Sequence, residues 1–414
     1  MISEQRAIFE QIVFVDLVGE KSPVPAGLFT LDTDTMIGKF AYGRRYLQRP
    51  DAIGLDPVNL PLSEQEYLTR KNSGIFGVLG DVLPDSWGKY ILAKRLSIPF
   101  GSLYPHEMFD YVNTNTVGAL SFGPTPDHPT TKQEKPVSFG DLHKVAEVYA
   151  KVMSDEQLPA EVLYLLEQGT SLGGAQPKCP VIYDHDEWIA KFENSKTPIR
   201  FPRLEFAAMQ MAKRAGITVP KVQLEEVNGS AVYLIKRFDR LSGKRIPFMS
   251  AHALSDLDLD ELEKGSYVEV ARQMRKFVKN VTRDLHEFYR RMVFNVFIRN
   301  QDDHLRNHGF IYQDNAWHLS PLYDVLPIPA RKTADDFSLS LNIGLEGTTA
   351  TLSNLYSQHE EFNLGREQAT QIIAEVAAVV SGWEKFLLDC KVEKNDLEAV
   401  RWCFEGFRKL SGYR

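Results

Sequence analysis

Three side chains in the C-terminal half have the types and spacing needed for phosphoryl transfer. Asp302 is followed after four intervening residues by Asn307, and Asp324 stands in Tyr323-Asp324-Val325, beyond a short predicted hairpin. The first carboxylate can accept a proton from a hydroxyl, while the amide and the second carboxylate can hold magnesium against nucleotide phosphates. Because D-x-x-x-x-N is common by chance, this interpretation depends on the other parts of the chain.

A second candidate is the hydroxyl- and glycine-rich segment GTSLGGAQPK, residues 169–178. Gly173 and Gly174 allow the backbone to approach a polyanion closely, so that successive N–H groups can point at phosphate oxygens. The segment lacks both the G-K-[ST] ending of a Walker A loop and the G-x-G-x-x-G pattern of protein kinases. A flexible turn between a helix and a strand is the alternative.

Lys191 lies in the strand-like segment WIAKFE, one predicted hairpin after the glycine-rich segment, and its apolar neighbours predict partial burial. Protein kinases place their phosphate-pairing lysine on such a strand, and Glu205 on the next predicted helix can hold it. A lone strand lysine is more often an exposed edge residue. The order of glycine segment, lysine, helical glutamate, D-x-x-x-x-N and second acid is the stronger signal.

The segment DDHLRNH also permits other interpretations. His304 and His308 are spaced i, i+4 and would bind zinc together with Asp302 or Asp303 if the segment were helical. No third, distant ligand is suggested. Asp303 also leaves the choice of catalytic base open by one residue. Cys179 has no nearby basic partner, so a Cys–His nucleophile has no local support.

The elements before residue 137 predict a β-rich domain and a linker. Short apolar runs alternate with turn residues between Ile12 and about Leu47, which is typical of antiparallel strands. Residues 84–96 predict a helix with Asp85 or Ser86 as its N-cap, and residues 113–123 predict a strand. Four prolines lie in the polar stretch 123–136. We therefore expect an N-terminal β-rich domain at 1–123 and a linker at 124–136.

The rest of the chain predicts an α+β region followed by helices. Residues 137–240 contain a helix at 141–153, two predicted hairpins and a helix that ends near Gly216. Asn228-Gly229 is a strong signal for a tight hairpin turn. In residues 241–414, apolar residues at helical spacing from Asp284 to Asn300 predict a buried helix that ends where the Asp302 loop begins. We expect a nucleotide-binding lobe at 137–240 and a helical catalytic lobe at 241–414.

Composition excludes several classes of protein. A net charge of −7 argues against a strongly basic nucleic-acid surface over the whole molecule and leaves a local basic patch open. Three widely spaced cysteines argue against a disulfide framework or zinc ribbon. The first residues lack the pattern of a signal peptide, and no apolar run reaches the roughly 18 residues that span a bilayer. We expect a soluble, cytoplasmic protein with no membrane contact.

Over nearly its whole length the chain resembles the HipA-type serine/threonine kinases of bacterial toxin–antitoxin modules. SLGGAQPK is similar to their glycine loop, NQDDHLRNHGF to their catalytic loop and LSPLYDVLP to their metal-binding segment. IKRFDR is similar to the strand end that forms their nucleotide hinge, and GVLGDVLPDSWG and NTNTVGALSF to parts of their N-terminal domain. The resemblance implies an α+β fold with a two-lobed protein-kinase-like core, an antiparallel-sheet lobe and a mostly helical lobe.

The resemblance also implies roles for individual residues. Asp302 would be the catalytic base, and Asn307 and Asp324 the magnesium ligands. Lys191 would pair with phosphate, supported by Glu205. The residues that would contact ATP are Gly173, Gly174, Ala175, Gln176, Pro177, Lys178, Lys191, Lys236, Arg237, Phe238, His304, Asn307, Tyr323 and Asp324. Two departures from the family pattern are Pro177, which removes a backbone N–H from the loop, and the basic hinge residue Lys236.

Ser171 stands where such kinases phosphorylate themselves. A phosphoserine charge of about −1.5 to −2 would repel ATP and disfavour the nucleotide-bound loop. The alternative role is an ordinary hydroxyl that donates to phosphate. The family further implies a helix-turn-helix antitoxin (HipB-like) that carries most of the DNA contact, and a protein substrate such as an aminoacyl-tRNA synthetase, notably the glutamyl enzyme.

The sequence therefore predicts a kinase toxin that uses ATP and Mg2+ and inactivates itself at Ser171. A kinase for a small molecule such as a sugar or aminoglycoside is the alternative within enzymes. A catalytically silent co-repressor bound to a DNA-binding antitoxin is the non-enzyme alternative, and the presence of all four catalytic-type residues argues against it.

Overall fold

The structure is a computed structural model, and it describes residues 7–153, 166, 176–194, 197–255, 257–328 and 338–411. The chain forms two compact units. The first unit comprises residues 1–187, 239–258 and 311–315, and the second comprises residues 188–238, 259–310 and 316–414. Within the described residues, no helix is long and apolar enough to cross a membrane.

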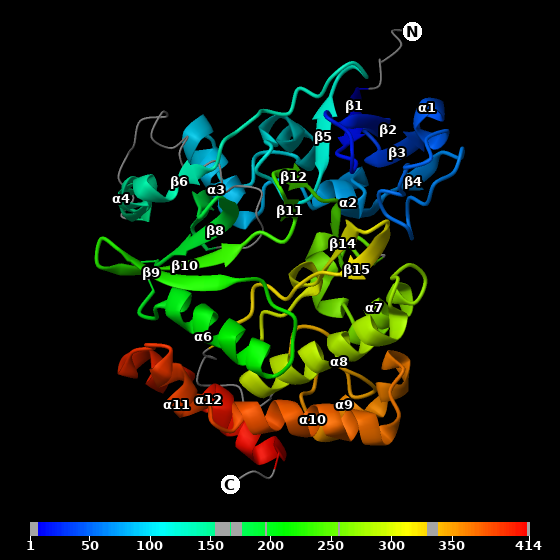
Figure 1. Ribbon diagram of the computed structural model, residues 1–414. Helices are drawn as coiled ribbons and strands as arrows, with labels where there is room; N and C mark the ends of the chain where they lie inside the picture. The colour runs from blue at the N-terminus through cyan, green and yellow to red at the C-terminus, as the bar shows by residue number, and fades with distance from the viewer. Residues whose placement is uncertain are drawn as a thin grey trace. The chain divides into compact units, whose positions relative to one another are not determined.

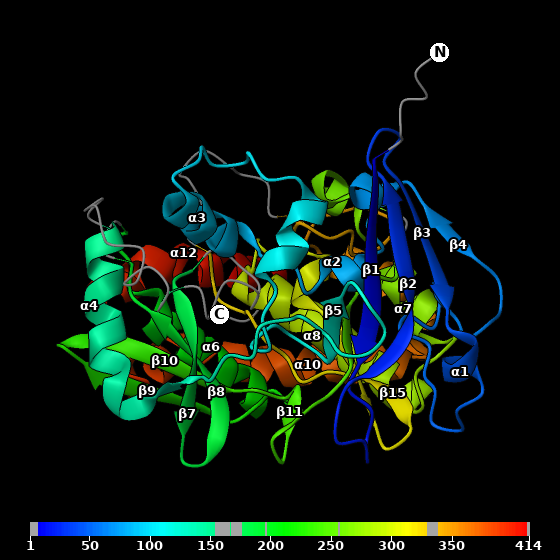
Figure 2. The same ribbon diagram turned by 90° about the horizontal axis from the view of Figure 1, so that it is seen from above.

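A five-stranded antiparallel sheet dominates the start of the first unit (Figure 2). Its order is β4-β3-β2-β1-β5, with β1 at Ile8–Val15, β2 at Val24–Asp32, β3 at Ile37–Tyr42, β4 at Tyr67–Thr69 and β5 at Leu120–Gly123. The buried rings of Phe29 on β2 and Phe40 on β3 pack against the buried Phe76 ring, each at a centroid distance of 6.4 Å. The alternating pattern therefore predicted strands in the regions of β1, β2 and β3, although β1 begins at Ile8, and it did not predict β4.

The strand pattern predicted up to about Leu47 is wrong after Tyr42, where β3 ends. Residues Arg44–Leu47 form the short helix α1. This helical turn places the buried Tyr46 ring parallel to Tyr42, with 5.8 Å between ring centroids, and the Tyr46 hydroxyl donates to the Ile53 carbonyl at 2.9 Å. Ring stacking and this buried hydrogen bond favour the turn over a longer strand.

The helix predicted at 84–96 is confirmed, whereas the strand predicted at 113–123 is shorter than expected. Helix α3, Ser86–Leu96, begins as predicted, because the Asp85 side chain accepts a hydrogen bond from the Gly88 N–H at 2.7 Å. The strand expected at 113–123 is confined to β5. Before it the chain turns, because the Asn113 side chain accepts from the Asn115 N–H at 2.9 Å.

The remaining elements of the first unit are short. They are α2 at Gly77–Gly80, β6 at Val137–Ser138, α4 at Leu142–Met153, β7 at Lys178–Tyr183, β11 at Arg240–Leu241, β12 at Lys244–Arg245 and β13 at Phe248–Ser250. The helix predicted at 141–153 is confirmed by α4. Strands β6 and β7 run parallel.

In the second unit, three antiparallel strands carry a helix. Strand β8, Asp186–Phe192, has its first two residues in the first unit; it pairs with β10, Ser230–Lys236, which pairs in turn with β9, Val222–Val227. Helix α6, Phe201–Arg214, packs on β9 and β10. Asn228 and Gly229 both have positive φ, 51° and 77°, as a type I′ hairpin turn requires.

The rest of the second unit is mostly helical. Its elements are α7 at Tyr267–Met274, α8 at Val281–Ile298, β14 at Gly309–Gln313 (which enters the first unit at Ile311), β15 at Ala316–Leu319, α9 at Leu352–Ser357, α10 at Arg366–Val380, α11 at Trp383–Asp389 and α12 at Lys394–Ser411. Helix α8 is the buried helix that the sequence predicted, and α10 and α12 both contact it (Figure 1). Its last turn leads into the loop that carries Asp302.

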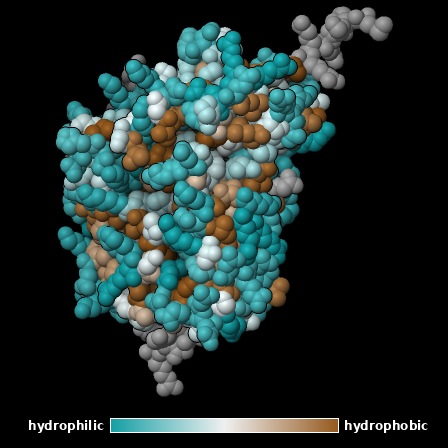
Figure 3. All heavy atoms as spheres, turned by 45° about the vertical axis from the view of Figure 1, so that its right-hand side comes forward, coloured by the Kyte–Doolittle hydropathy of each residue, from teal (hydrophilic) through white to brown (hydrophobic). Residues whose placement is uncertain are grey.

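The surface of the molecule is largely hydrophilic on the face drawn in Figure 3, where hydrophobic residues emerge in small separate groups. Val18 in the first unit and Leu345 in the second are among the exposed large hydrophobic side chains. Scattered residues of this kind are ordinary on folded proteins.

Candidate active site

The loop after α8 brings Asp302 and Asn307 together. Helix α8 ends at Ile298, and its C-cap residue Arg299 adopts a left-handed conformation with φ 55°. From Asp302 onward exposed or half-buried residues alternate with buried ones, so that Asp302 is accessible to solvent while Asp303, Leu305 and Asn307 are buried. The Asn307 Nδ2 donates to the Asp302 carbonyl at 2.9 Å. The two residues of the D-x-x-x-x-N motif therefore lie side by side.

The environment of Asp302 suits a proton acceptor. Partial burial raises the pKa of its carboxyl, His304 acts in the opposite direction, and the negative charges of Asp324 and Asp303 raise the pKa further. Asp324 is therefore near enough to Asp302 for its charge to act on it. Two neighbouring carboxylates repel each other, and a divalent cation held there would relieve that repulsion.

Asp303 has a different environment. Its side chain is fully buried, the Tyr267 hydroxyl donates to its Oδ2, and the His308 Nε2 lies 3.0 Å from its Oδ1. Because these contacts enclose the Asp303 carboxyl, it is not accessible to a substrate hydroxyl in the described part of the chain. Of the two adjacent acids, only Asp302 is exposed to solvent.

Lys191 is the centre of a buried charge cluster. Its Nζ lies 2.6 Å from the Glu205 Oε1 and 2.7 Å from the Asp324 Oδ1, and Lys191 and Glu205 are only 7% and 0% exposed. Burial alone would lower the pKa of the ammonium, but the charges of Asp324 and Glu205 outweigh it and raise the pKa above its usual value. The lysine is therefore held charged. The sequence predicted the contact with Glu205 but not the contact with Asp324.

The segment around Asp324 is held in place by its neighbours. Asp324 has a positive φ of 55°, a left-handed conformation that costs a non-glycine residue roughly 1–2 kcal/mol and that other contacts must offset. The Tyr323 hydroxyl donates to the Arg306 carbonyl at 2.9 Å, and its ring lies 5.6 Å from the Phe238 ring, centroid to centroid. These contacts join the Asp324 segment to the Asp302 loop and to the end of β10.

Family models match the chain over two stretches. The HipA N-terminal domain matches residues 22–123, and the HipA-like C-terminal domain matches residues 170–383, more than half of the chain. This chain belongs to the HipA family. All the candidate residues placed so far lie within the second of these matches.

Individual relatives agree with this assignment. The serine/threonine-protein kinase toxin HipA of Shewanella oneidensis is 22% identical over 67% of this chain and 68% of its own length. The protein Y4mE of Sinorhizobium fredii is 24% identical over 79% of this chain and 80% of its own length. The fold of this chain is similar to that of a chain in the solved complex of HipA, HipB and operator DNA from Shewanella oneidensis, with a TM-score of 0.71. The match has 16% identity and covers 97% of this chain and 98% of the chain in the complex. The HipA-family chain thus has the two-lobed, kinase-like α+β fold that the sequence predicted.

The predicted hinge of this HipA-family chain follows β10 directly. Lys236 and Phe238 are half-buried, whereas Arg237 is buried. The backbone N–H of Lys236 already donates to the Lys221 carbonyl at 2.9 Å. A contact between the hinge and an adenine ring therefore needs the other backbone groups of this segment.

The predicted phosphate loop is described only at its C-terminal end. Gln176, Pro177 and Lys178 belong to the described residues, whereas Ser171, Gly173, Gly174 and Ala175 lie outside them. Lys178 is buried, and its Nζ lies 3.6 Å from the Asp85 Oδ2, within the first unit. The Tyr149 hydroxyl donates to the Lys178 carbonyl. The sequence contained no signal for the Lys178–Asp85 contact.

Two alternative chemistries find no support in the described part of the chain. No group of three or more His, Cys, Asp or Glu side chains that could hold a metal ion occurs there. The segment 305–307 forms a single 3-10 turn, so His304 and His308 do not have the helical spacing that zinc binding would need. Burial raises the pKa of the Cys403 thiol to about 12 and that of Cys179 above its usual value, which keeps both protonated.

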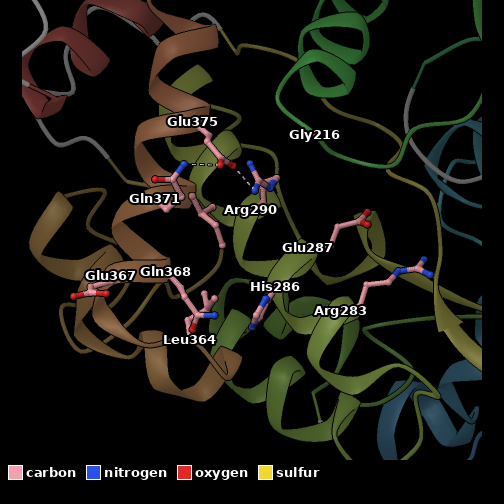
Figure 4. A pocket seen from close by; sticks show the side chains of 11 residues that line it. Gly216, Arg283, His286, Glu287, Arg290, Leu364, Glu367, Gln368, Gln371 and Glu375 are labelled. Atoms are coloured by element: carbon pink, nitrogen blue, oxygen red, sulfur yellow. Dashed lines mark hydrogen bonds and ion pairs between the residues drawn. The ribbon is translucent and has the colours of Figure 1, made fainter.

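A separate hollow of about 600 Å³ lies between α8 and α10 in the second unit (Figure 4). It is lined by Gly216, Arg283, His286, Glu287, Arg290, Leu364, Glu367, Gln368, Gln371, Ile372 and Glu375. Arg290 Nη2 lies 2.6 Å from the Glu375 Oε2, and the Gln371 Nε2 donates to the Glu375 Oε1 at 2.8 Å. None of the candidate catalytic residues lines this hollow.

Proposed function

We propose that this HipA-family chain is the serine/threonine protein kinase toxin of a toxin–antitoxin module, and that it uses ATP and Mg2+. The observation that carries the proposal is the cluster in which Lys191 joins Glu205 and Asp324 beside the Asp302 loop. A buried, fixed cation next to two acids is what positioning and charge neutralisation of a phosphoryl group require. The relative from Shewanella oneidensis that bears the name serine/threonine-protein kinase toxin supports the same activity.

The residues at this site fit magnesium and nucleotide. Asn307 and Asp324 offer the amide and carboxylate oxygens that Mg2+ prefers. Burial is the main cause of the raised pKa of Asp302, and the negative charges of Asp324 and Asp303 add to it; a cation would offset these charges. Asn307 and Asp324 would hold the ion, which when bound neutralises phosphate charge. His304, Tyr323 and the residues from Gly173 to Lys178 and from Lys236 to Phe238 would surround the nucleotide.

The chain's own groups then divide the work of the reaction. Asp302 orients the seryl or threonyl hydroxyl of the substrate and accepts its proton as the oxygen takes up the phosphoryl group. Lys191 pairs with phosphate, and Glu205 prevents its side chain from swinging away. Because these groups are already in position, the site contributes mainly orientation and electrostatic stabilisation of the transition state.

Regulation and partners follow from the same assignment. Autophosphorylation at Ser171 would add a charge of about −1.5 to −2 beside the phosphates and so disfavour ATP binding. A helix-turn-helix, HipB-like antitoxin would carry most of the DNA contact, which agrees with the net charge of −7 and with the HipA, HipB and operator DNA complex of the structural relative. An aminoacyl-tRNA synthetase such as the glutamyl enzyme is the proposed substrate class.

Transfer of labelled γ-phosphate tests the proposal. The chain is incubated with Mg-ATP alone, with purified aminoacyl-tRNA synthetases, and with sugars and aminoglycosides. We expect label on protein, including the chain itself at Ser171, and no label on the small molecules. Label on a metabolite alone would establish a small-molecule kinase instead. Bound nucleotide without any transfer would favour a catalytically silent co-repressor.

A further inference from the structure

The second acid of the catalytic loop belongs to a buried polar network beneath Asp302. The Tyr267 hydroxyl, from α7, donates to the Asp303 Oδ2, and the Asn295 Nδ2, from α8, donates to the Tyr267 hydroxyl at 3.0 Å. His308, at the end of the loop, places its Nε2 3.0 Å from the Asp303 Oδ1. We call Tyr267, Asn295, Asp303 and His308 the loop clamp.

The loop clamp is enclosed on every side that the structure describes. All four of its residues are buried, at 0% exposure each. The His308 ring packs edge-on against the Tyr267 and Phe288 rings, with centroid distances of 5.4 and 5.1 Å. A second amide extends the network, since the Asn300 Nδ2 donates to the Asn295 Oδ1 at 3.3 Å. The Tyr267 hydroxyl is hydrogen-bonded to the Asp303 Oδ2, whereas the His308 Nε2 lies close to the Oδ1 without hydrogen-bond geometry. Losing the bond from Tyr267 would leave a second buried carboxyl oxygen without a partner, which is costly, so Tyr267 restrains the position of Asp303.

The loop clamp also fixes Asp302. The two acids are adjacent in the chain, and the alternation of exposed and buried residues places Asp302 at the surface when Asp303 points inward. Both ends of the loop are anchored, by Asp303 and by His308, while Asn307 bonds to the Asp302 carbonyl between them. A shift of Asp303 would therefore move both Asp302 and Asn307.

We propose that Asp303 is a positioning residue for phosphoryl transfer, which acts through Tyr267 and His308 to hold Asp302 and Asn307 in register. This inference rests on the proposed kinase function and assigns the second acid and the second histidine of DDHLRNH to the same task. The clamp makes no contact with Lys191 or the hinge among the described residues, so its loss affects the rate of transfer more than nucleotide binding.

The test compares Asp303→Asn, Tyr267→Phe and the double variant with the wild-type chain. Asp284→Asn is the matched control, because Asp284 is also buried in the second unit and accepts from the Leu319 N–H at 3.3 Å, away from the loop. The measurements are kcat, the KM for ATP, the Kd of Mg-ATP by calorimetry, and amide hydrogen exchange of residues 302–307.

We expect kcat to fall about 10- to 100-fold in Asp303→Asn, because small displacements of reacting groups have effects of this size, while the Kd of Mg-ATP changes less than about threefold. Tyr267→Phe should show a smaller fall, and the double variant should lose less than the product of the two single effects. Exchange in residues 302–307 should rise in both single variants and stay unchanged in Asp284→Asn.

Several results would overturn the proposal. They are an unchanged kcat in folded Asp303→Asn, an equal loss of Mg-ATP binding, or the same fall of kcat in Asp284→Asn. If Asp303→Asn does not fold, an unchanged kcat in Tyr267→Phe decides against it. If the wild-type chain transfers no phosphate, the proposed kinase function is wrong. Hydrogen exchange then tests the loop clamp separately, because unchanged exchange of residues 302–307 in Asp303→Asn and Tyr267→Phe would contradict it.

Discussion

Two places in the second unit hold a cation between acceptors, and they differ in burial. Lys191 contacts Glu205 and Asp324, and the Lys191 and Glu205 side chains are 9% and 0% exposed. Arg290 contacts Glu375 in the hollow between α8 and α10, where the side chains are 19% and 42% exposed. The Lys191–Glu205 and Arg290–Glu375 contacts are equally close, at 2.6 Å. Water screens the charges of the Arg290–Glu375 pair but hardly those of the Lys191–Glu205 pair, so only the Lys191 cluster can act strongly on a phosphoryl group.

The largest difference between the two places should appear when each cation is removed. Lys191→Met leaves Glu205 buried without its partner, which should destabilise the chain by about 3–5 kcal/mol and reduce phosphate transfer by roughly a thousandfold or more. Urea unfolding and a transfer assay measure the two effects. A Lys191→Met variant with near-normal transfer would refute the role of the cluster.

The pH dependence of transfer sharpens the same contrast at an intermediate size. Burial, Asp324 and Asp303 raise the pKa of Asp302, and only the deprotonated carboxylate can accept a proton. Activity should therefore be complete above this raised pKa and fall about tenfold for each pH unit below it. The ordinary pKa of an aspartate is about 3.9, and the acid limb of the kcat/KM profile should lie at a higher pH than this value. A limb at the ordinary value would contradict the environment described for Asp302.

The smallest effect is expected from the exposed pair. Arg290→Met should change the free energy of unfolding by no more than about 1 kcal/mol, because exposed ion pairs contribute little. Transfer and Mg-ATP affinity should equal those of the wild-type chain. A marked loss of transfer in this variant would show that burial is not what separates the two places.

The comparison also shows what sequence could predict. Asp302 and Asn307 lie close together because a short loop fixes their separation, and Lys191 meets Glu205 because the strand and the next helix pack as a local unit. The contact of Asp324 with Lys191 joins residues 133 positions apart. Such a contact depends on how the whole unit packs, and no local pattern encodes it.

Two other differences have separate causes. The helical turn at Arg44–Leu47 is stabilised by stacking of the Tyr46 and Tyr42 rings, which overrode a plausible strand pattern. The turn before β5 follows from a local hydrogen bond, in which the Asn113 side chain accepts from the Asn115 N–H. Spacing to Asn307 points to Asp302, and the structure adds a difference in burial between the two adjacent acids, which no local pattern predicted. Resemblance to a family supplied the residue roles, and these roles stay predictions.

The most direct test of the account is the intact mass of the wild-type chain and of Asp302→Ala after incubation with ATP and Mg2+. The account predicts a gain of one phosphate in the wild-type chain alone, at Ser171, with Mg-ATP binding retained in the variant. The same gain in both proteins, in a variant shown to be folded, would contradict the role of Asp302 as the catalytic base.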